Sequence, residues 1–208
     1  MAHGRKFWNR HAARYAKSPV ADEESYQQKL RVTREYLDAD MEVLEFGCGT
    51  GSTALVHAPF VKHIHAFDIS SRMIEIARAK LEASNVMNVD FDAVAIEDLH
   101  VPDRSLDAVL GLNILNLLVD RDAAIAKVWA MLKPGGVFVS STVCLGETMK
   151  FFKLVGPVGE FFGLLPPIRI FTSQQLITSL SDGGFVIEHQ WQPAKDKAIF
   201  VVARKPEA

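Results

Sequence analysis

Three glycines at alternate positions, directly after a short apolar segment, constrain the fold of this chain more than any other feature of its sequence. Residues 41–46 have the length and the apolar character of a buried strand, and Gly47, Gly49 and Gly51 follow them. Glycine lets the backbone turn tightly and lets a ligand approach it closely. Because ligands of open parallel sheets bind at the carboxyl ends of the strands, we expect a ligand-binding turn here.

Strands and helices alternate downstream of this turn. The expected strands are 63–67, 89–94, 106–112 and 137–142, and the expected helices are 71–84 and 120–132. This alternation predicts parallel strands with crossover helices. Two final strands, 185–192 and 198–204, are too close in sequence for a crossover and must pair antiparallel. The predicted fold class is α/β: a doubly wound, mostly parallel seven-stranded sheet that ends in an antiparallel hairpin, with helices on both faces.

Length and composition agree with one globular domain. The chain has 208 residues, of which 49% are hydrophobic and 23% charged. Its formal net charge is -2 and no run of Lys and Arg is dense, so we expect no nucleic-acid partner. The most apolar stretch, 149–170, is interrupted by charged residues, Gly and Pro, so no transmembrane segment is predicted. Few cysteines and a polar N-terminus without a secretory leader favour a cytoplasmic protein.

Two other glycine-rich motifs do not fit the cluster. A dinucleotide-binding loop, G-x-G-x-x-G, needs glycine at the position where Ser52 stands. A phosphate-binding loop needs Gly-Lys-Ser/Thr after four intervening residues, and no lysine is present there. The turn is therefore assigned to neither class.

The segment Glu45-Phe46-Gly47-Cys48-Gly49-Thr50-Gly51 resembles the first signature of the class I S-adenosylmethionine-dependent methyltransferases, an acidic residue, any residue and then Gly-x-Gly-x-Gly. The resemblance covers about residues 41–142 and includes the terminal hairpin. It implies S-adenosylmethionine (SAM) as cofactor and S-adenosylhomocysteine (SAH) as product, with Glu45 near the cationic end of the cofactor. A carboxylate suits a ligand with a sulfonium and an ammonium but no phosphate. The cofactor contacts implied by the resemblance are Glu45, Phe46, Gly47, Cys48, Gly49, Gly51, Asp68, Ile69, Met73, Ala95, Ile96 and Asn113.

Asp68 ends the second expected strand and matches the second signature of the family. The resemblance implies that its carboxylate accepts both ribose hydroxyls. The alternative is an N-cap for helix 71–84, but Ser70 or the serine after it can cap that helix, so ribose binding is favoured. Ile69 and Met73 are then expected to contact the adenine, although either residue can equally belong to the core.

The position after the third strand departs from the family. In many relatives an Asp there bonds the adenine amino group, and the alignment places Ala95 at this position. Because its side chain accepts no hydrogen bond, we expect the backbone of Ala95 or Ile96 to meet the adenine edge. Asp98 is an alternative acceptor that the register favours less.

Four further residues are candidates for contact with the cofactor or acceptor. Asn113 and Asn116 lie in the segment that, in relatives, passes between the two molecules, and Asn113 is expected to bond the cofactor. Capping of the next helix or turn explains both asparagines equally well. Residues 1–40 are expected to form a helical lid, in which Trp8 and Tyr15 either shield the sulfonium by cation–π contact or pack on the sheet.

An aromatic segment is expected to form the roof of the acceptor pocket. Residues 145–172 are interpreted as a substrate-side insertion, and they contain two phenylalanine pairs. Because one face of a short helix cannot bury both pairs, Phe152 and Phe162 are candidate acceptor contacts. The roof favours a largely apolar, lipid-like acceptor and peripheral contact with a membrane.

His63 and His65 are two residues apart in an expected strand, so they share one face of the sheet. No third ligand is evident in the sequence, so no metal site is predicted. The remaining histidines are scattered, and most are interpreted as surface or packing residues.

The predicted function is SAM-dependent methyl transfer to a small-molecule or lipid-like acceptor by a single domain, 1–208, with a cofactor-binding core at 41–142 and a hairpin at 185–204. Catalysis of such a displacement rests on positioning and on exclusion of water, so no catalytic residue is assigned. The alternative is a non-catalytic binding subunit with a methyltransferase fold. An aminopropyl transferase is not favoured, because no paired aspartates follow the fourth strand. The sequence does not define the acceptor atom (N, O or C), the use of a general base, or the oligomeric state.

Overall fold

The computed structural model of the protein describes residues 2–146 and 168–207. A seven-stranded sheet lies at its centre, in the order β3-β2-β1-β4-β5-β7-β6. The strands are β1 (Glu42–Phe46), β2 (His63–Phe67), β3 (Val89–Asp92), β4 (Leu106–Leu112), β5 (Leu132–Val143), β6 (Val186–Trp191) and β7 (Ala198–Arg204). Strands β1 to β5 pair in parallel, and β7 pairs antiparallel with both β5 and β6. The predicted fold class is therefore confirmed.

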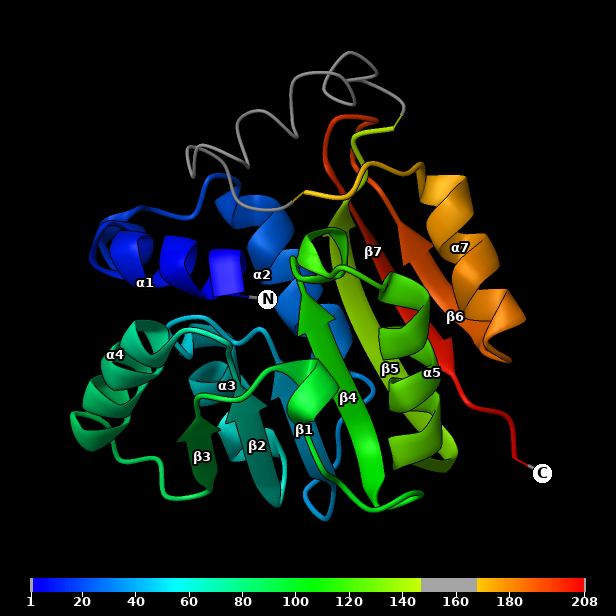
Figure 1. The fold of residues 1–208 in the computed structure, drawn as a ribbon. Coiled ribbons are helices and arrows are strands. Elements are labelled where there is room, and N and C mark those ends of the chain that lie inside the picture. Colours follow the sequence, from blue (N-terminus) through cyan, green and yellow to red (C-terminus); the bar gives the residue numbers. More distant parts are fainter. Residues whose placement is uncertain (1, 147–167, 208) are drawn as a thin grey trace.

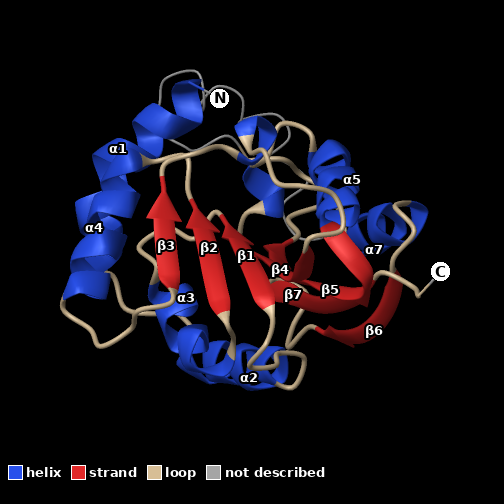
Figure 2. Cartoon of the chain, turned by 90° about the horizontal axis from the view of Figure 1, so that it is seen from below, coloured by secondary structure: helices blue, strands red, loops and turns tan. Residues whose placement is uncertain are grey.

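Helices cover both faces of the sheet (Figure 1, Figure 2). They are α1 (Ala2–Lys17), α2 (Glu23–Arg34), α3 (Ser52–His57), α4 (Ser71–Glu82), α5 (Arg121–Met131) and α7 (Ser173–Asp182), with short 3-10 helices η1 (Ala58–Phe60), η2 (Ile96–Asp98) and η3 (Leu115–Leu117). Val128 of α5 and Leu176 of α7 belong to the core on one face. The core on the other face includes Val32 of α2, Ala54 of α3 and Ile74 of α4. Helix α1 packs beside α4 and lies across the carboxyl ends of the first strands (Figure 1).

Polar side chains fix the starts of four helices. The caps are Asp22 for α2, Ser70 for α4, Asp120 for α5 and Thr172 for α7, and each accepts a hydrogen bond from the backbone N–H three residues later. Such caps stabilise a helix by about 1 kcal/mol, because they satisfy a donor that the first turn leaves unpaired. Of the helices in the two described ranges, none has both the length and the apolar character needed to cross a bilayer.

Strand β5 begins earlier than the expected strand 137–142. Pro134, Gly135 and Gly136, which precede the expected strand, are part of β5 in the structure. Gly135 donates its backbone N–H to the Lys205 carbonyl, and Lys205 donates to the Gly136 carbonyl, both over 2.9 Å. Pairing with the end of the chain therefore keeps this segment extended.

Strand β3 is shorter than the expected strand 89–94. It ends at Asp92, and Val94 donates its backbone N–H to the Asp92 carbonyl over 3.1 Å in a tight turn. The turn brings Val94 and the two residues after it to the carboxyl ends of the strands, where they line a pocket.

Candidate active site

The loop between β1 and α3 holds its glycines in the left-handed region, with φ of +67° at Gly47, +55° at Gly49 and +75° at Gly51. A Cβ atom on Gly47 would come within 2.6 Å of the Ile114 side chain. A Cβ atom on Gly51 would come within 2.6 Å of the Phe91 ring in β3. Neighbouring side chains therefore leave no room for a side chain at Gly47 or at Gly51. Among the described residues, a Cβ atom on Gly49 would meet only Tyr15, at 3.7 Å, which is an ordinary van der Waals distance. The described residues therefore leave room beside the backbone of Gly49.

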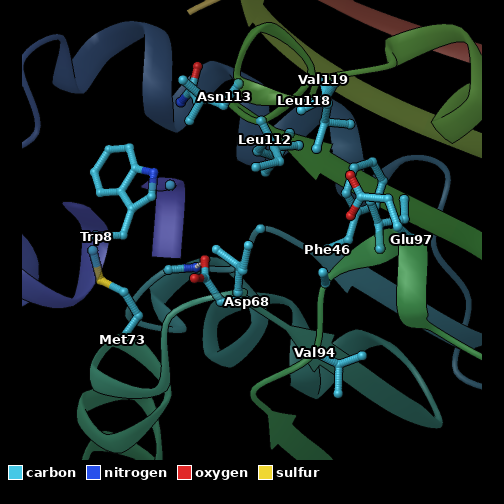
Figure 3. Close-up of a pocket in the computed structure, with 18 of the residues that line it drawn as sticks. Trp8, Phe46, Asp68, Met73, Val94, Glu97, Leu112, Asn113, Leu118 and Val119 are labelled. Carbon is cyan, nitrogen blue, oxygen red and sulfur yellow. Dashed lines mark hydrogen bonds between the residues drawn. The ribbon is translucent and has the colours of Figure 1, made fainter. Parts of the chain in front are cut away.

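A pocket opens over Gly49 at the carboxyl ends of the strands (Figure 3). Its lining combines apolar side chains with a few polar groups, as sites for small-molecule ligands do. The pocket brings together these predicted site residues: Trp8, Tyr15, Phe46, Gly47, Gly49, Asp68, Ile69, Met73, Ala95, Ile96 and Asn113. In Figure 3, Asp68 lies between Trp8 and Met73 on one side and the apolar residues Leu112 and Leu118 on the other.

A second pocket adjoins the first at the glycine loop. The residues common to both pockets are Tyr15, Gly47, Gly49, Leu112 and Asn113. The second pocket adds Glu45 and Cys48 of the predicted site. Gly51 lines neither pocket, and its place in the loop is explained by packing.

Glu45 is a buried carboxylate at the edge of this second pocket. It is 2% exposed, and its Oε2 atom has no hydrogen-bond partner among the described residues. Burial, and to a smaller extent the charge of Asp68, raise the pKa of Glu45 to about 8. An unpaired buried carboxylate is costly, and a cation in the pocket would offset that cost. The site therefore suits a ligand that carries an ammonium group.

Asp68 connects the end of β2 to the glycine loop. Its Oδ2 accepts the Gly49 N–H over 3.0 Å, and its Oδ1 accepts the Ser70 N–H over 2.8 Å. Burial raises the pKa of Asp68, and these two backbone hydrogen bonds oppose that shift. The N-cap of α4 is Ser70, so the structure rules out that alternative role for Asp68. Each Asp68 oxygen keeps a second acceptor site, as ribose hydroxyls would require.

The wall after β3 is apolar at the position where the family resemblance implies an aspartate. Ala95 lines the pocket and is buried, beside Val94 and Ile96. Asp98, the alternative acceptor, does not line the pocket, whereas Glu97 does. No sequence motif indicates Glu97, because the family register places the adenine contact at Ala95.

Helix α1 is held against α4 by Asn9, which the sequence analysis also missed. Asn9 Oδ1 accepts from Ser70 Oγ over 2.7 Å and from the Arg72 N–H over 3.3 Å. This anchor places Trp8 and Tyr15 at the pocket, with their rings edge to face at 6.1 Å between centroids. Desolvation and the charges of nearby carboxylates raise the pKa of Tyr15, so its phenol stays protonated.

The two asparagines after β4 differ in their position relative to the pockets. Asn113 has a φ of +57°, donates its backbone N–H to the Ser141 carbonyl over 2.6 Å and lines both pockets. Asn116 lines neither pocket, and its carbonyl accepts from the Arg169 N–H over 2.7 Å. Phe152 and Phe162, with most of the predicted roof, lie outside the described residues.

Lys29 of α2 contributes a positive charge that no sequence motif indicated. Its Nζ donates to Ser141 Oγ over 3.0 Å inside the second pocket. Burial is the largest cause of a lowered pKa at Lys29. The second pocket thus contains a carboxylate, Glu45, and an ammonium, Lys29.

Sequence comparisons identify relatives along most of the chain. A family described as a methyltransferase domain matches residues 43–136. The malonyl-[acyl-carrier protein] O-methyltransferase of Priestia megaterium is 31% identical over 199 residues, which cover 92% of this chain and 71% of that protein. A ubiquinone biosynthesis O-methyltransferase of a Methylobacterium species is 24% identical over 189 residues, which cover 82% of this chain and 75% of that protein. Three other such O-methyltransferases match over only 43%, 40% and 41% of their own lengths.

Solved structures share the fold at low sequence identity. YcgJ of Bacillus subtilis has a TM-score of 0.73 at 19% identity, covering 88% of this chain and all 100% of that one. Phosphoethanolamine N-methyltransferase 2 of Haemonchus contortus, in complex with SAH, also has a TM-score of 0.73, at 17% identity. The match covers 88% of this chain and 53% of that one. The fold, the glycine loop and the relatives define a class of protein, the class I SAM-dependent methyltransferases. The chain belongs to this family, whose cofactor is SAM.

Proposed function

We propose that this protein transfers the methyl group of SAM to a small-molecule or lipid-like acceptor. The observation that carries the proposal is the buried carboxyl group of Glu45, whose Oε2 has no partner in the part of the chain that the structure describes, next to the loop backbone at Gly49. A site that only packed against another protein would have no need of an unpaired buried carboxyl group.

The second pocket offers both charges that the amino-acid end of the cofactor needs. Glu45 would hold the α-ammonium group, and Lys29 would hold the α-carboxylate. Gly49 lets this end of the cofactor approach the backbone, because glycine has no side chain of its own to occupy that space.

The first pocket suits the nucleoside. Asp68 would accept the ribose hydroxyls, while the surrounding Met73, Val94 and Ala95 side chains offer apolar contact to the adenine. Glu97 lines the same pocket and would accept from the adenine amino group in place of the aspartate of relatives.

The cofactor supplies an electrophilic methyl group on a sulfonium leaving group, and the residues of this chain position it and exclude water. Tyr15 and Trp8 of α1 line the pocket and would help to exclude water from the bound cofactor. The Tyr15 phenol and, because burial raises its pKa, the Cys48 thiol are both protonated at neutral pH, so neither serves as a base there. An acceptor whose nucleophile is already reactive would need no general base. Two relatives matched over most of their length are O-methyltransferases, which supports an oxygen nucleophile.

The experiment is a transfer assay with radiolabelled SAM and separate pools of carboxylic acids, phenols, amines and lipids. We expect label in one pool and stoichiometric release of SAH. Glu45→Gln should lose transfer, whereas Glu42→Gln, at the partly exposed start of the same strand, should retain it. SAH binding without transfer to any pool would instead support the non-catalytic binding subunit.

A further inference from the structure

The outer edge of the sheet carries a cluster that the proposed function does not use. Strands β2 and β3 form this edge (Figure 1), and His63 and His65 of β2 share one sheet face with Asp90 of β3. Ligand atoms of the three side chains all lie within 4.8 Å of one another. None of the three lines either pocket, so the cluster is separate from the candidate active site.

The topology supplies the third ligand that the sequence did not show. His65 and Asp90 are direct partners in the parallel pairing of β2 and β3, although they lie in different strands. His63 precedes His65 by two residues and therefore lies on the same face. The pairing of β2 with β3 therefore brings Asp90 beside the two histidines, and the three side chains form a group of possible metal ligands.

A surface ion pair between His63 and Asp90 is the simpler explanation, with Nε2 and Oδ2 at 2.9 Å. It does not account for His65, whose ring centroid lies 4.4 Å from that of His63. Two imidazoles this close to each other and to a carboxylate can bind one metal ion together.

The charges around the cluster favour a cation. The carboxylates of Glu42, Asp90 and Asp92 all act on His65 in the direction that stabilises positive charge. One cation is already present, since Lys62 pairs with Glu42 over 2.8 Å. An ion can enter from solvent, because the side chains of His63 and Asp90 are 25% and 64% exposed.

We propose that His63, His65 and Asp90 form a binding site for a divalent transition-metal ion, with Zn²⁺ as the ion that the donor set fits best. Two imidazole nitrogens and one carboxylate oxygen are donors that Zn²⁺ accepts in a tetrahedral arrangement, with water at the fourth position. Adjacent donors in such a site are about 3.4 Å apart, which these partly exposed side chains reach by small rotations. The ion would fasten the edge strand β3 to β2.

The test is calorimetric titration of Zn²⁺ into the full chain, prepared without a polyhistidine tag and treated with a chelator. We expect one Zn²⁺ per chain. His65→Gln and Asp90→Asn should each weaken binding by about tenfold or more. The matched control is His189→Gln, because His189 lies in β6 at the opposite edge of the sheet, and it should bind Zn²⁺ as the wild type does.

A second readout uses the melting temperature. Zn²⁺ should raise it for the wild type and for His189→Gln but not for His65→Gln, since an ion that binds only the folded state stabilises it. Unchanged SAH affinity in all variants would show that they are folded. Wild-type protein that binds Zn²⁺ no better than His65→Gln does, or equal weakening by His189→Gln, would overturn the proposal.

Discussion

Gly49 donates its backbone N–H to Oδ2 of Asp68 over 3.0 Å, which ties the loop after β1 to the end of β2. The two signatures of the family are thus parts of one structural unit at the edge of the pocket. Asp68 holds the loop in shape and still presents acceptor sites to a ligand. Substitutions in this unit should therefore show which of its residues stabilise the loop and which bind the cofactor.

Asp68→Ala should weaken SAH binding by about 1–3 kcal/mol, because charge-assisted hydrogen bonds to the ribose are lost. The free energy of unfolding should also fall by about 1 kcal/mol, because the Gly49 N–H loses its acceptor. Calorimetry and urea denaturation measure the two effects, and Asp103→Ala on an exposed loop is the control. Unchanged SAH affinity in Asp68→Ala would place the ribose elsewhere.

Gly49→Val should abolish SAH binding in a protein that remains folded, because its side chain would fill the space over the loop. The left-handed φ adds a strain of about 1–2 kcal/mol, which a domain of this size tolerates. Gly51→Ala should behave in the opposite way and reduce stability, because its Cβ atom would lie 2.6 Å from the Phe91 ring. Circular dichroism and calorimetry distinguish the two, and normal binding by Gly49→Val would show that the loop is only a turn.

Binding of SAH should release a proton near neutral pH. The pKa of Glu45 is raised to about 8 in the protein alone, and an ammonium group beside it favours the ionised form. SAH affinity should therefore rise from pH 6 to pH 8 in the wild type and stay nearly flat in Glu45→Gln. Titrations in buffers of different ionisation enthalpy count the released proton, and Glu42→Gln is the control. A wild-type affinity that does not change with pH would contradict this role of Glu45.

His57 should make the fold sensitive to mild acid. It is fully buried, its ring nitrogens have no partner among the described residues, and burial followed by the charge of Arg34 lowers its pKa to about 4. Because the unfolded state binds a proton near pH 6.5, the stability that depends on neutral His57 is present above pH 6.5. It is lost as the pH falls towards 4, by up to about 3 kcal/mol.

Urea denaturation of the wild type and of His57→Leu at pH 4.5, 5.5 and 7 tests this expectation. The wild type should lose stability between pH 6.5 and 4.5 by a larger amount than the variant does. His100→Gln, at an exposed position, should follow the wild type. Parallel pH profiles for the wild type and His57→Leu would show that His57 does not titrate on unfolding.

The fold and the position of the cofactor pocket could be predicted because local signals agree with the topology. Alternating strands and helices give a parallel sheet, and a glycine cluster after β1 lies where the pocket opens. Ser70, one of the two expected caps, caps helix α4. The carboxylate of Asp68 therefore accepts the Gly49 N–H of the glycine loop.

Residues brought in by tertiary contacts could not be predicted in this way. Lys29 and Asn9 lie in ordinary amphipathic helices, and their partners Ser141 and Ser70 are distant in sequence. Asp90 likewise meets the two histidines of β2 only through strand register, which a single sequence does not define.

The central claim, that the glycine loop and Asp68 bind the cofactor, is tested most directly by a crystal structure of the protein grown with SAH. We expect density for one SAH molecule across both pockets, with the ribose within hydrogen-bond distance of Asp68 and the amino-acid end beside Gly49 and Glu45. Clear SAH density at another place, with both pockets filled only by solvent, would contradict the account.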